Sequence, residues 1–286
     1  MKNSIKFYDY NLPSNLIAEN PRPKREHAKL MIYDQEFDTL DHSIFSHLDK
    51  YLTKGDLVIL NDTRVLPGRL FLKKESGGTV EILFHKLINQ YSFICIFKSS
   101  RKVAVHSKLF FDDENFFVVD NIEKNFITLS SNIDPMDVFV KYGEVPLPKY
   151  IKRKTNAKDI ERYQTVYAKH TGSVAAPTAG LHFTEEILSK LQAKGVVIDY
   201  CTLHVTYNTF KPITVDNYND HRIGSEICNI KESLISKIKS TKSQNHNVYA
   251  VGTTATRAVE NYASKSYVGD FSGEADLYIT PGYKFK

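Results

Sequence analysis

The run His170-Thr171-Gly172-Ser173-Val174-Ala175-Ala176-Pro177-Thr178-Ala179-Gly180-Leu181-His182-Phe183-Thr184 decides how the rest of the chain is interpreted. It is rich in small and hydroxylated residues and holds two histidines, a combination that a packed core does not need. Thr184 is a suitable helix N-cap, and Glu185 and Glu186 follow it at the positive end of the predicted helix. A loop of this kind lets a ligand approach the backbone. We therefore predict a binding site here, at a strand-to-helix connection of an α/β fold.

A second segment, residues 248–263, repeats this arrangement. Its apolar start predicts a strand, which leads through Gly252-Thr253-Thr254-Ala255-Thr256-Arg257 into a helix. Free N–H groups at such helix starts suit phosphate or carboxylate ligands, which gather at the carboxyl ends of strands in α/β sheets. The alternative is an ordinary strand-to-helix turn. Neither segment contains a P-loop or a dinucleotide-binding glycine pattern.

Strands and helices alternate at both ends of the chain, which predicts an α/β domain. Residues 28–33 and 57–60 are predicted to be strands, and Asp41 or Ser43 is predicted to cap a helix that ends near Leu52. In the C-terminal half, a strand is expected at 196–205 and an amphipathic helix at 231–240.

Between these parts, apolar residues alternate with polar ones, as in half-buried strands. Turn-forming residues such as Ser76-Gly77-Gly78 and Asn89-Gln90 separate the short strands, which predicts a small antiparallel barrel. We therefore expect an α/β main domain, residues 1–65 and 141–286, that is interrupted by an inserted antiparallel β-barrel domain at residues 66–140.

The composition is that of an ordinary globular protein: 286 residues, of which 42% are hydrophobic and 25% charged. No apolar run approaches the roughly 20 residues of a membrane span, and the N-terminus lacks the apolar core of a signal peptide. Cys95, Cys201 and Cys228 are widely spaced and form no metal-binding motif. A cytoplasmic protein is the expectation, with no metal.

Positive charge is concentrated in the second half of the chain. Residues 1–140 hold 18 basic and 19 acidic side chains, whereas residues 141–286 hold 20 and 14. Residues 149–169 are the most basic segment. A solvated surface explains this, and contact with a nucleic-acid backbone is the sharper alternative. Its basic residues are Lys149, Lys152, Arg153, Lys154, Lys158, Arg162 and Lys169.

Three histidines lie in or near the opening run: His170, His182 and His204. Their spacing matches no zinc motif, so general acid–base chemistry is the better hypothesis. The residues Asn61-Asp62-Thr63-Arg64 directly follow an apolar strand, where polar side chains often line a cleft. The alternative is that Asp62 and Arg64 pair with each other to fix a hinge.

Short motifs along the whole chain match one known family in order. They are Phe7, Asp9-Tyr10 and Leu12-Pro13, Gly55-Asp56-Leu57 with Asn61-Asp62-Thr63-Arg64-Val65, Gly143-Glu144-Val145-Pro146-Leu147-Pro148, Tyr163-Gln164-Thr165, Ser173 to Thr184, His204 with Thr209-Phe210-Lys211-Pro212, Gly252-Thr253-Thr254 with Arg257, and Ile279-Thr280-Pro281-Gly282-Tyr283. Through them the chain resembles the S-adenosylmethionine:tRNA ribosyltransferase-isomerase family of queuosine biosynthesis.

The resemblance implies an α/β domain with a β-barrel insert, as expected above. It also implies that the ribosyl part of S-adenosylmethionine is transferred to 7-aminomethyl-7-deazaguanine at the wobble position of tRNA and isomerised. The products are epoxyqueuosine in tRNA, adenine and methionine. S-adenosylmethionine is then a substrate, with no permanently bound cofactor, no metal and no membrane partner, and we expect a cytoplasmic monomer.

This chemistry asks for a base, because the sulfonium acidifies the ribose C5′–H, and for an acid, because adenine leaves better when protonated. We hypothesise that His170, His182 and His204 include both. The predicted substrate-binding residues are Asn61, Arg64, Thr171, Ala176, Pro177, Thr178, Ala179, Gly180, Phe183, Thr209, Phe210, Thr253, Thr254 and Arg257. The predicted tRNA-binding residues are Lys149, Lys152 and Arg153.

The chain departs from the family pattern in two places. The family favours glycines between His204 and Thr209, whereas Val205-Thr206-Tyr207-Asn208 stand here, and the side chains of Thr206 and Tyr207 are expected to narrow the pocket. The sequence stops at Lys286, where the family continues, and we expect an uncovered sheet edge and part of the site to be missing. The alternatives are a catalytically impaired tRNA-binding relative and a different nucleotide-dependent α/β transferase without an RNA substrate.

Overall fold

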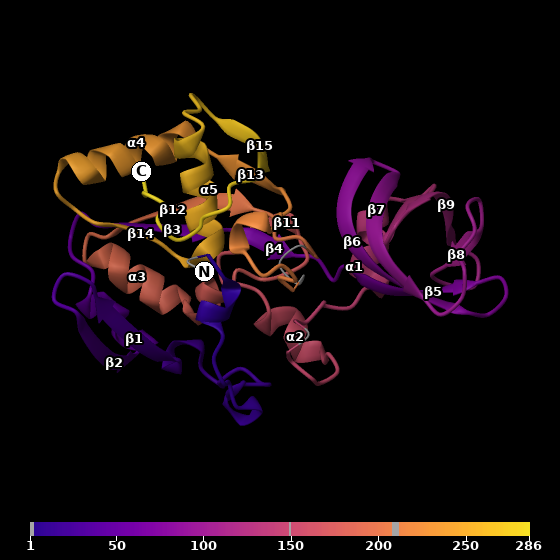
Figure 1. The fold of residues 1–286 in the computed structure, drawn as a ribbon, viewed down its shortest axis with the longest axis horizontal. Coiled ribbons are helices and arrows are strands. Elements are labelled where there is room, and N and C mark those ends of the chain that lie inside the picture. Colours follow the sequence, from indigo (N-terminus) through magenta and orange to yellow (C-terminus); the bar gives the residue numbers. More distant parts are fainter. Residues whose placement is uncertain (1–2, 149, 208–211) are drawn as a thin grey trace.

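The chain forms an α/β domain with a barrel beside it (Figure 1). The structure is a computed structural model that describes residues 3–148, 150–207 and 212–286. Within these residues, no helix has both the length and the apolar character that crossing a membrane requires.

A five-stranded mixed sheet is the centre of the α/β domain, with the order β14-β3-β12-β13-β15. β3 runs parallel to both of its neighbours, while β13 is antiparallel to β12 and β15. The parallel strands place their carboxyl ends at one edge of the sheet. The strands are β3 (Leu57–Asn61), β12 (Val197–Leu203), β13 (Glu226–Ile230), β14 (Val248–Ala250) and β15 (Phe271–Ala275).

Helices cover both faces of this sheet. α3 (Glu185–Ala193) packs on the face that carries Val58 and Leu60, and α4 (Glu232–Ser243) and α5 (Gly252–Ser264) pack on the other face. All five residues of β3 are buried. Burial on both faces is the reason that β3 is an unbroken apolar run rather than an alternating one.

The predicted helix from residue 41 to 52 is wrong in its first part. β1 (Lys29–Asp34) pairs with β2 (Thr39–Ile44) as an antiparallel hairpin, and only Phe45–Lys50 is helical, as a 3₁₀ helix. Pairing with β1 satisfies the backbone of β2, which outweighs the local capping signal of Asp41 and Ser43. Leu48 and Leu52 still pack against α3, as the apolar spacing predicted.

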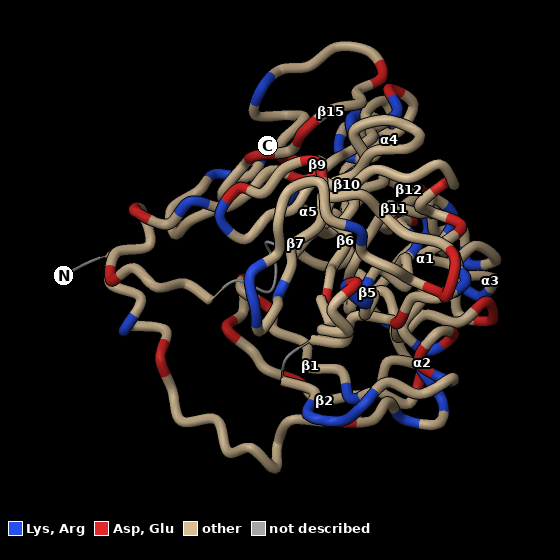
Figure 2. The backbone as a smooth tube through the Cα atoms, turned by 90° about the vertical axis from the view of Figure 1, so that its right-hand side faces the viewer, with Lys and Arg blue, Asp and Glu red and all other residues tan. Residues whose placement is uncertain are grey.

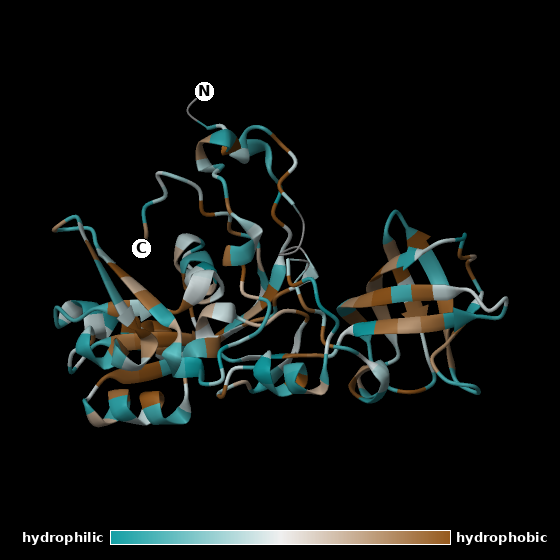
Figure 3. Cartoon of the chain, turned by 90° about the horizontal axis from the view of Figure 1, so that it is seen from below, coloured by the Kyte–Doolittle hydropathy of each residue, from teal (hydrophilic) through white to brown (hydrophobic). Residues whose placement is uncertain are grey.

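The predicted antiparallel barrel is confirmed as a closed barrel of order β10-β7-β6-β5-β8-β9. Figure 3 shows its hydrophobic strands beside the main domain. α1 (Pro135–Tyr142) packs against the barrel, where the rings of Phe139 and Phe93 meet edge-on at 5.7 Å. The domain boundaries at 65/66 and 140/141 stay a prediction. The barrel strands are β5 (Arg69–Lys74), β6 (Thr79–Asn89), β7 (Ser92–Ser99), β8 (Lys108–Phe110), β9 (Phe116–Glu123) and β10 (Phe126–Ser130).

A short parallel pair, β4 (Thr63–Val65) and β11 (His170–Ser173), lies between the central sheet and the barrel (Figure 1). Val174, directly after β11, belongs to the same apolar cluster as the barrel core. Ala176 and Leu181 then pack against Tyr163, which directly follows α2 (Ala157–Arg162). The N-terminus of α2 has a capping box between Asn156 and Asp159. The 170–184 run therefore lies where the two parts of the molecule join.

Candidate active site

The 170–184 run forms β11, a buried stretch, and a 3₁₀ helix over Thr178–His182. Thr184 then caps α3, since its Oγ1 accepts a hydrogen bond from the amide of Ile187 at 3.3 Å. The predicted cap and helix are confirmed. The run lies beside the carboxyl ends of β3 and β12, where α/β proteins place their ligands.

The two strand-to-helix segments meet at their small residues. A β-carbon on Gly252, whose φ is +81°, would lie 3.0 Å from the β-carbon of Ala179. A β-carbon on Gly180 would overlap the Tyr167 hydroxyl, at 2.1 Å. Thr253 is exposed, and the Thr254 hydroxyl is buried with no hydrogen-bond partner among the described residues. Close packing of the loops thus explains the glycines, and Thr254 is left with unused hydrogen-bonding capacity.

His170 lies at the start of β11, with half of its side chain exposed. Its Nε2 faces Asp62 Oδ2 at 3.6 Å. The other oxygen of Asp62 accepts a hydrogen bond of 2.6 Å from the Thr202 hydroxyl, so the carboxylate has a fixed orientation. This arrangement gives an accessible imidazole with an oriented carboxylate behind it.

His204 directly follows β12 and lies near His170. Its Nδ1 is 2.8 Å from the hydroxyl of the fully buried Thr63, and its ring stacks on the backbone of β11 at Gly172. Burial, and then the neighbouring His170, lower the pKa of His204. A neutral imidazole near pH 7 is the consequence.

His182 occupies a different environment. Its ring packs against Phe45 with 5.4 Å between centroids, and burial lowers its pKa. Within the described residues, no contact joins it to His170 or His204. The structure therefore brings together two of the three predicted histidines.

His182 lines a hollow of about 290 Å³ between the N-terminal arm, the basic segment and the 170–184 run. Half of its lining residues are apolar or aromatic, and Arg153, Thr178 and His182 are the predicted site residues within it. Apolar and aromatic walls that carry several polar and charged side chains can hold and orient a small polar ligand. The lining residues are Ala18, Glu19, Asn20, Pro21, Leu147, Tyr150, Ile151, Arg153, Asp159, Arg162, Tyr163, Thr178, Leu181 and His182.

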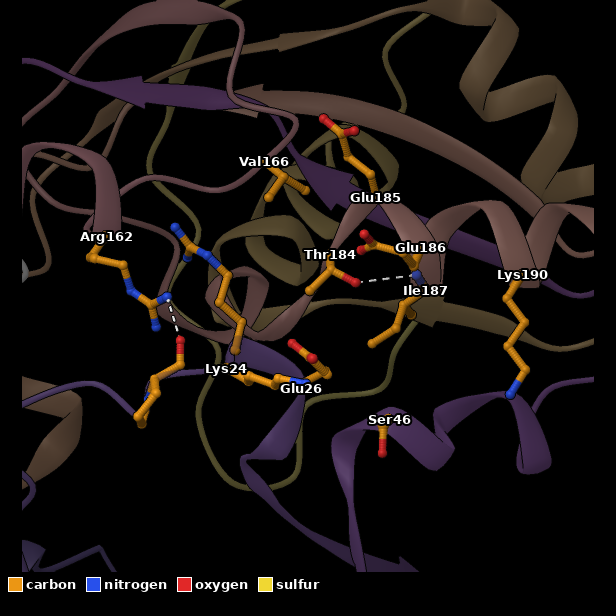
Figure 4. A pocket seen from close by; sticks show the side chains of 12 residues that line it. Lys24, Glu26, Ser46, Arg162, Val166, Thr184, Glu185, Glu186, Ile187 and Lys190 are labelled. Atoms are coloured by element: carbon orange, nitrogen blue, oxygen red, sulfur yellow. Dashed lines mark hydrogen bonds between the residues drawn. The ribbon is translucent and has the colours of Figure 1, made fainter.

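A larger and more open hollow of about 740 Å³ lies at the start of α3 (Figure 4). Lys24, Arg162 and Lys190 line it, but so do Glu185 and Glu186 from the first turn of the helix. These carboxylates occupy the positive helix end that an anion would use. The mixed charge makes this hollow a poor phosphate site.

Three predicted polar residues make contacts within the protein. The Asn61 amide is buried and bonds both backbone groups of Leu203, at 2.9 and 3.0 Å. Arg64 donates to the carbonyl of Ala168 rather than to Asp62, so the alternative of an Asp62–Arg64 hinge pair is wrong. Arg257 is buried and donates to Glu226 at 2.7 Å and to the carbonyls of residues 224 and 277.

The remaining predicted ligand contacts are spread through the run. Thr171 is exposed, whereas Ala176, Pro177 and Phe183 are buried, and the Phe183 ring packs edge-on against Phe45. Thr209, Phe210 and Lys149 lie outside the described residues. Thr206 is buried and its amide donates to Glu226 at 2.9 Å, and a pocket narrowed by Thr206 and Tyr207 stays a prediction.

Some basic side chains of residues 149–169 are exposed, and others are hydrogen-bonded within the protein. Lys and Arg positions gather around α2 (Figure 2). Lys152 is exposed, whereas Arg153 makes two hydrogen bonds to Asp159, at 2.6 and 2.7 Å, and a third to the carbonyl of Glu19. Arg162 likewise donates to the carbonyls of Arg22 and Pro23. These arginines fasten the N-terminal arm to the basic segment.

Sequence reasoning assigned no role to the residues that hold the two histidines: Thr63 and Gly172 were named only as parts of longer motifs, and Thr202 was missed. Only one signal pointed to them: Thr63 and Thr202 lie at the ends of apolar strands, where Asp62 and His204 were already noticed. Their partners lie about 140 positions away in the sequence, so pairing them required the fold.

A family model described as queuosine biosynthesis protein matches residues 5–286. The chain is 44% identical to the S-adenosylmethionine:tRNA ribosyltransferase-isomerase of Hydrogenobaculum sp. over 99% of its length and 82% of that protein's. It is 39% identical to the enzyme of the same name from Thermosipho melanesiensis, over 98% of this chain and 83% of that protein.

A solved structure of a protein of the same kind also resembles this chain. The chain is 26% identical to the protein in the crystal structure of the S-adenosylmethionine tRNA ribosyltransferase from Thermotoga maritima, and the two folds match with a TM-score of 0.50. The match covers 98% of this chain and 81% of that one. The fold thus defines a protein with an α/β domain and a barrel of the queuosine-biosynthesis type. The chain belongs to the S-adenosylmethionine:tRNA ribosyltransferase-isomerase family.

Proposed function

We propose that this protein is an S-adenosylmethionine:tRNA ribosyltransferase-isomerase. It transfers the ribosyl part of S-adenosylmethionine to the aminomethyl group of 7-aminomethyl-7-deazaguanine at the wobble position of tRNA and isomerises it. Epoxyqueuosine in tRNA, adenine and methionine are the products. Family membership over nearly the whole chain supports this activity.

The pair of His170 and His204 is the structural observation that carries the proposal. One imidazole faces a carboxylate and the other is held neutral by burial, so their environments differ although they are neighbours. Groups whose environments differ in this way can divide acid and base work at one pH. The reaction needs both, because a proton leaves C5′ and adenine must depart.

The substrate nucleoside binds at these histidines, and the 290 Å³ hollow lined by Thr178 and His182 holds a further part of the substrate. Thr171, Thr178 and Thr253 are exposed and can donate or accept hydrogen bonds, and the buried Thr254 hydroxyl has unused capacity. The loop that lines the site takes its shape from small and apolar residues, namely Ala176, Pro177, Ala179, Gly180 and Phe183. Asn61, Arg64 and Arg257 act by holding strand ends and loops. His182 lines the hollow as a third candidate acid or base.

The tRNA lies along the basic segment, and Lys152 is an exposed cation that contacts its phosphates. Arg153 supports the segment through Asp159, and Lys149 is a further phosphate contact. No permanent cofactor or metal takes part, and the protein works as a cytoplasmic monomer.

A product assay tests this function. The protein is incubated with S-adenosylmethionine and a tRNA that carries the deazaguanine precursor, and the tRNA is then digested to nucleosides for mass spectrometry. We expect the epoxyqueuosine nucleoside, and none from the same tRNA with an unmodified guanine. Tight tRNA binding without this product would instead indicate the impaired relative.

A further inference from the structure

The contact between Thr63 and His204 is buried, and the Thr63 hydroxyl makes it without another partner among the described residues. Thr63 lies at the first position of β4, its side chain is 0% exposed, and its Oγ1 is 2.8 Å from His204 Nδ1. In the part of the chain that the structure describes, this hydroxyl has no second partner. The bond to His204 is therefore the one hydrogen bond, among the described residues, that can satisfy the buried Thr63 hydroxyl.

That requirement decides where the imidazole proton lies. A hydroxyl carries one proton, and burying it without an acceptor is costly. If Nδ1 were protonated, the Thr63 oxygen would accept a hydrogen bond from it, and the hydroxyl's own proton would have no acceptor. If the hydroxyl donates to Nδ1, no donor is left unpaired, and the ring proton of the neutral imidazole lies on Nε2.

The environment of the ring fixes the direction of this Nε2–H. Gly172 packs under the ring, where a β-carbon would come within 2.9 Å of Cε1. Nε2 makes no hydrogen bond to the described residues and is not among their buried, unpaired atoms, so it is open to a ligand. Burial and His170 lower the pKa of His204, which keeps the ring neutral near pH 7.

We propose that Thr63 is a positioning residue that holds His204 in the Nε2–H tautomer, so that a neutral imidazole presents a hydrogen-bond donor to the substrate. Its role in catalysis rests on the proposed ribosyl transfer. A nitrogen that already bears a proton cannot take one from C5′, so another group is the base. A donor suits the departing adenine, which keeps the electrons of its broken bond to ribose and gains negative charge.

Imidazole ¹⁵N chemical shifts test the tautomer without any activity. In ¹⁵N-labelled protein at pH 7.5, the signals absent from His204→Gln identify this ring. We expect an unprotonated Nδ1 and a protonated Nε2 in the wild type and in Thr63→Ser, which keeps the hydroxyl. We expect a mixture of tautomers in Thr63→Val, which has the same shape without it. A protonated Nδ1 in the wild type, or an unchanged tautomer in Thr63→Val, would overturn the proposal.

Steady-state kinetics test the catalytic role with the same variants. We expect Thr63→Val to lower kcat about tenfold with KM for both substrates unchanged, and Thr63→Ser to retain activity. Equal kcat in all three proteins would contradict the role of the donor. A wild type with the Nε2–H tautomer that releases no adenine would contradict the proposed function while supporting the assignment of Thr63.

Discussion

At the residue scale, the three histidines of the site differ in the groups that surround their rings. His170 faces a carboxylate and is half exposed, while His204 is held between a hydroxyl and a glycine. His182 packs against an aromatic ring. The sequence could predict that histidines gather here, but not which of them are neighbours, because His170 contacts Asp62 and His204 contacts Thr63 and Gly172, which are distant from them in the sequence.

Gly172→Ala tests whether the stacking of His204 matters. The new methyl group would lie about 3 Å from the ring, at a residue whose φ is +155°. We expect a destabilisation of about 1–3 kcal/mol from the backbone strain and crowding, and a kcat at least ten times lower because His204 shifts. Thermal unfolding and adenine release measure the two effects.

Gly77→Ala is the matched control. Gly77 has a φ of +79° in a barrel hairpin, and a β-carbon there would touch nothing within 4 Å. It should lose comparable stability from strain while keeping wild-type kcat. Equal kcat in both variants would show that the stacking is irrelevant to catalysis.

At the element scale, strand patterns were predictable and pairings were not. The alternation of the barrel strands, the buried run of β3 and the cap of α3 follow from local rules. β2 was missed, because its burial pattern is almost wholly exposed and its strand conformation comes from pairing with β1. Arg153 likewise looked like a free cation until Asp159 on α2 was placed beside it.

The barrel carries an acid-sensitive link between a loop and α1. Asp112 accepts hydrogen bonds from the backbone amide and the side-chain amide of Asn115, from the Tyr142 hydroxyl and from the amide of Glu114, and these contacts lower its pKa from 3.8 to about 2. A lowered carboxyl pKa means that its stabilisation is present above pH 3.8 and is lost as the pH falls towards 2. We expect Asp112→Asn to lower the unfolding temperature at pH 7 and to match the wild type near pH 2.

Asp113→Asn is the control for this prediction, since the neighbouring Asp113 is exposed and makes none of these bonds. Thermal unfolding from pH 7 to pH 2 compares the three proteins. A constant gap between Asp112→Asn and wild type across that range would refute the link.

At the scale of the whole molecule, the sequence predicted the α/β domain, the inserted barrel and a basic segment beside the site. It could not separate charges that contact a ligand from charges that hold the fold together. Arg257 and Arg153 are buried or bonded within the protein, whereas Lys152 is exposed. That distinction depends on partners that are distant in the sequence.

Lys152→Ala and Arg153→Ala should therefore differ. Removing Lys152 should weaken tRNA binding and lower the slope of log affinity against log salt by about one, without changing stability. Removing Arg153 should cost about 1.5–3 kcal/mol of stability through the lost bonds to Asp159, with a smaller effect on the salt slope. Filter binding over a salt series and thermal unfolding distinguish them, and identical salt slopes for the two variants would contradict the assignment.

Adenine release from S-adenosylmethionine, measured with and without the precursor tRNA, tests most directly that this protein is a ribosyltransferase-isomerase with its chemistry at the His170–His204 pair. We predict release that requires the tRNA, falls at least about a hundredfold in His170→Gln, and is unchanged in His42→Gln, where the histidine is exposed on β2. Release that does not depend on the tRNA, or that proceeds equally in His170→Gln and wild type, would contradict the account.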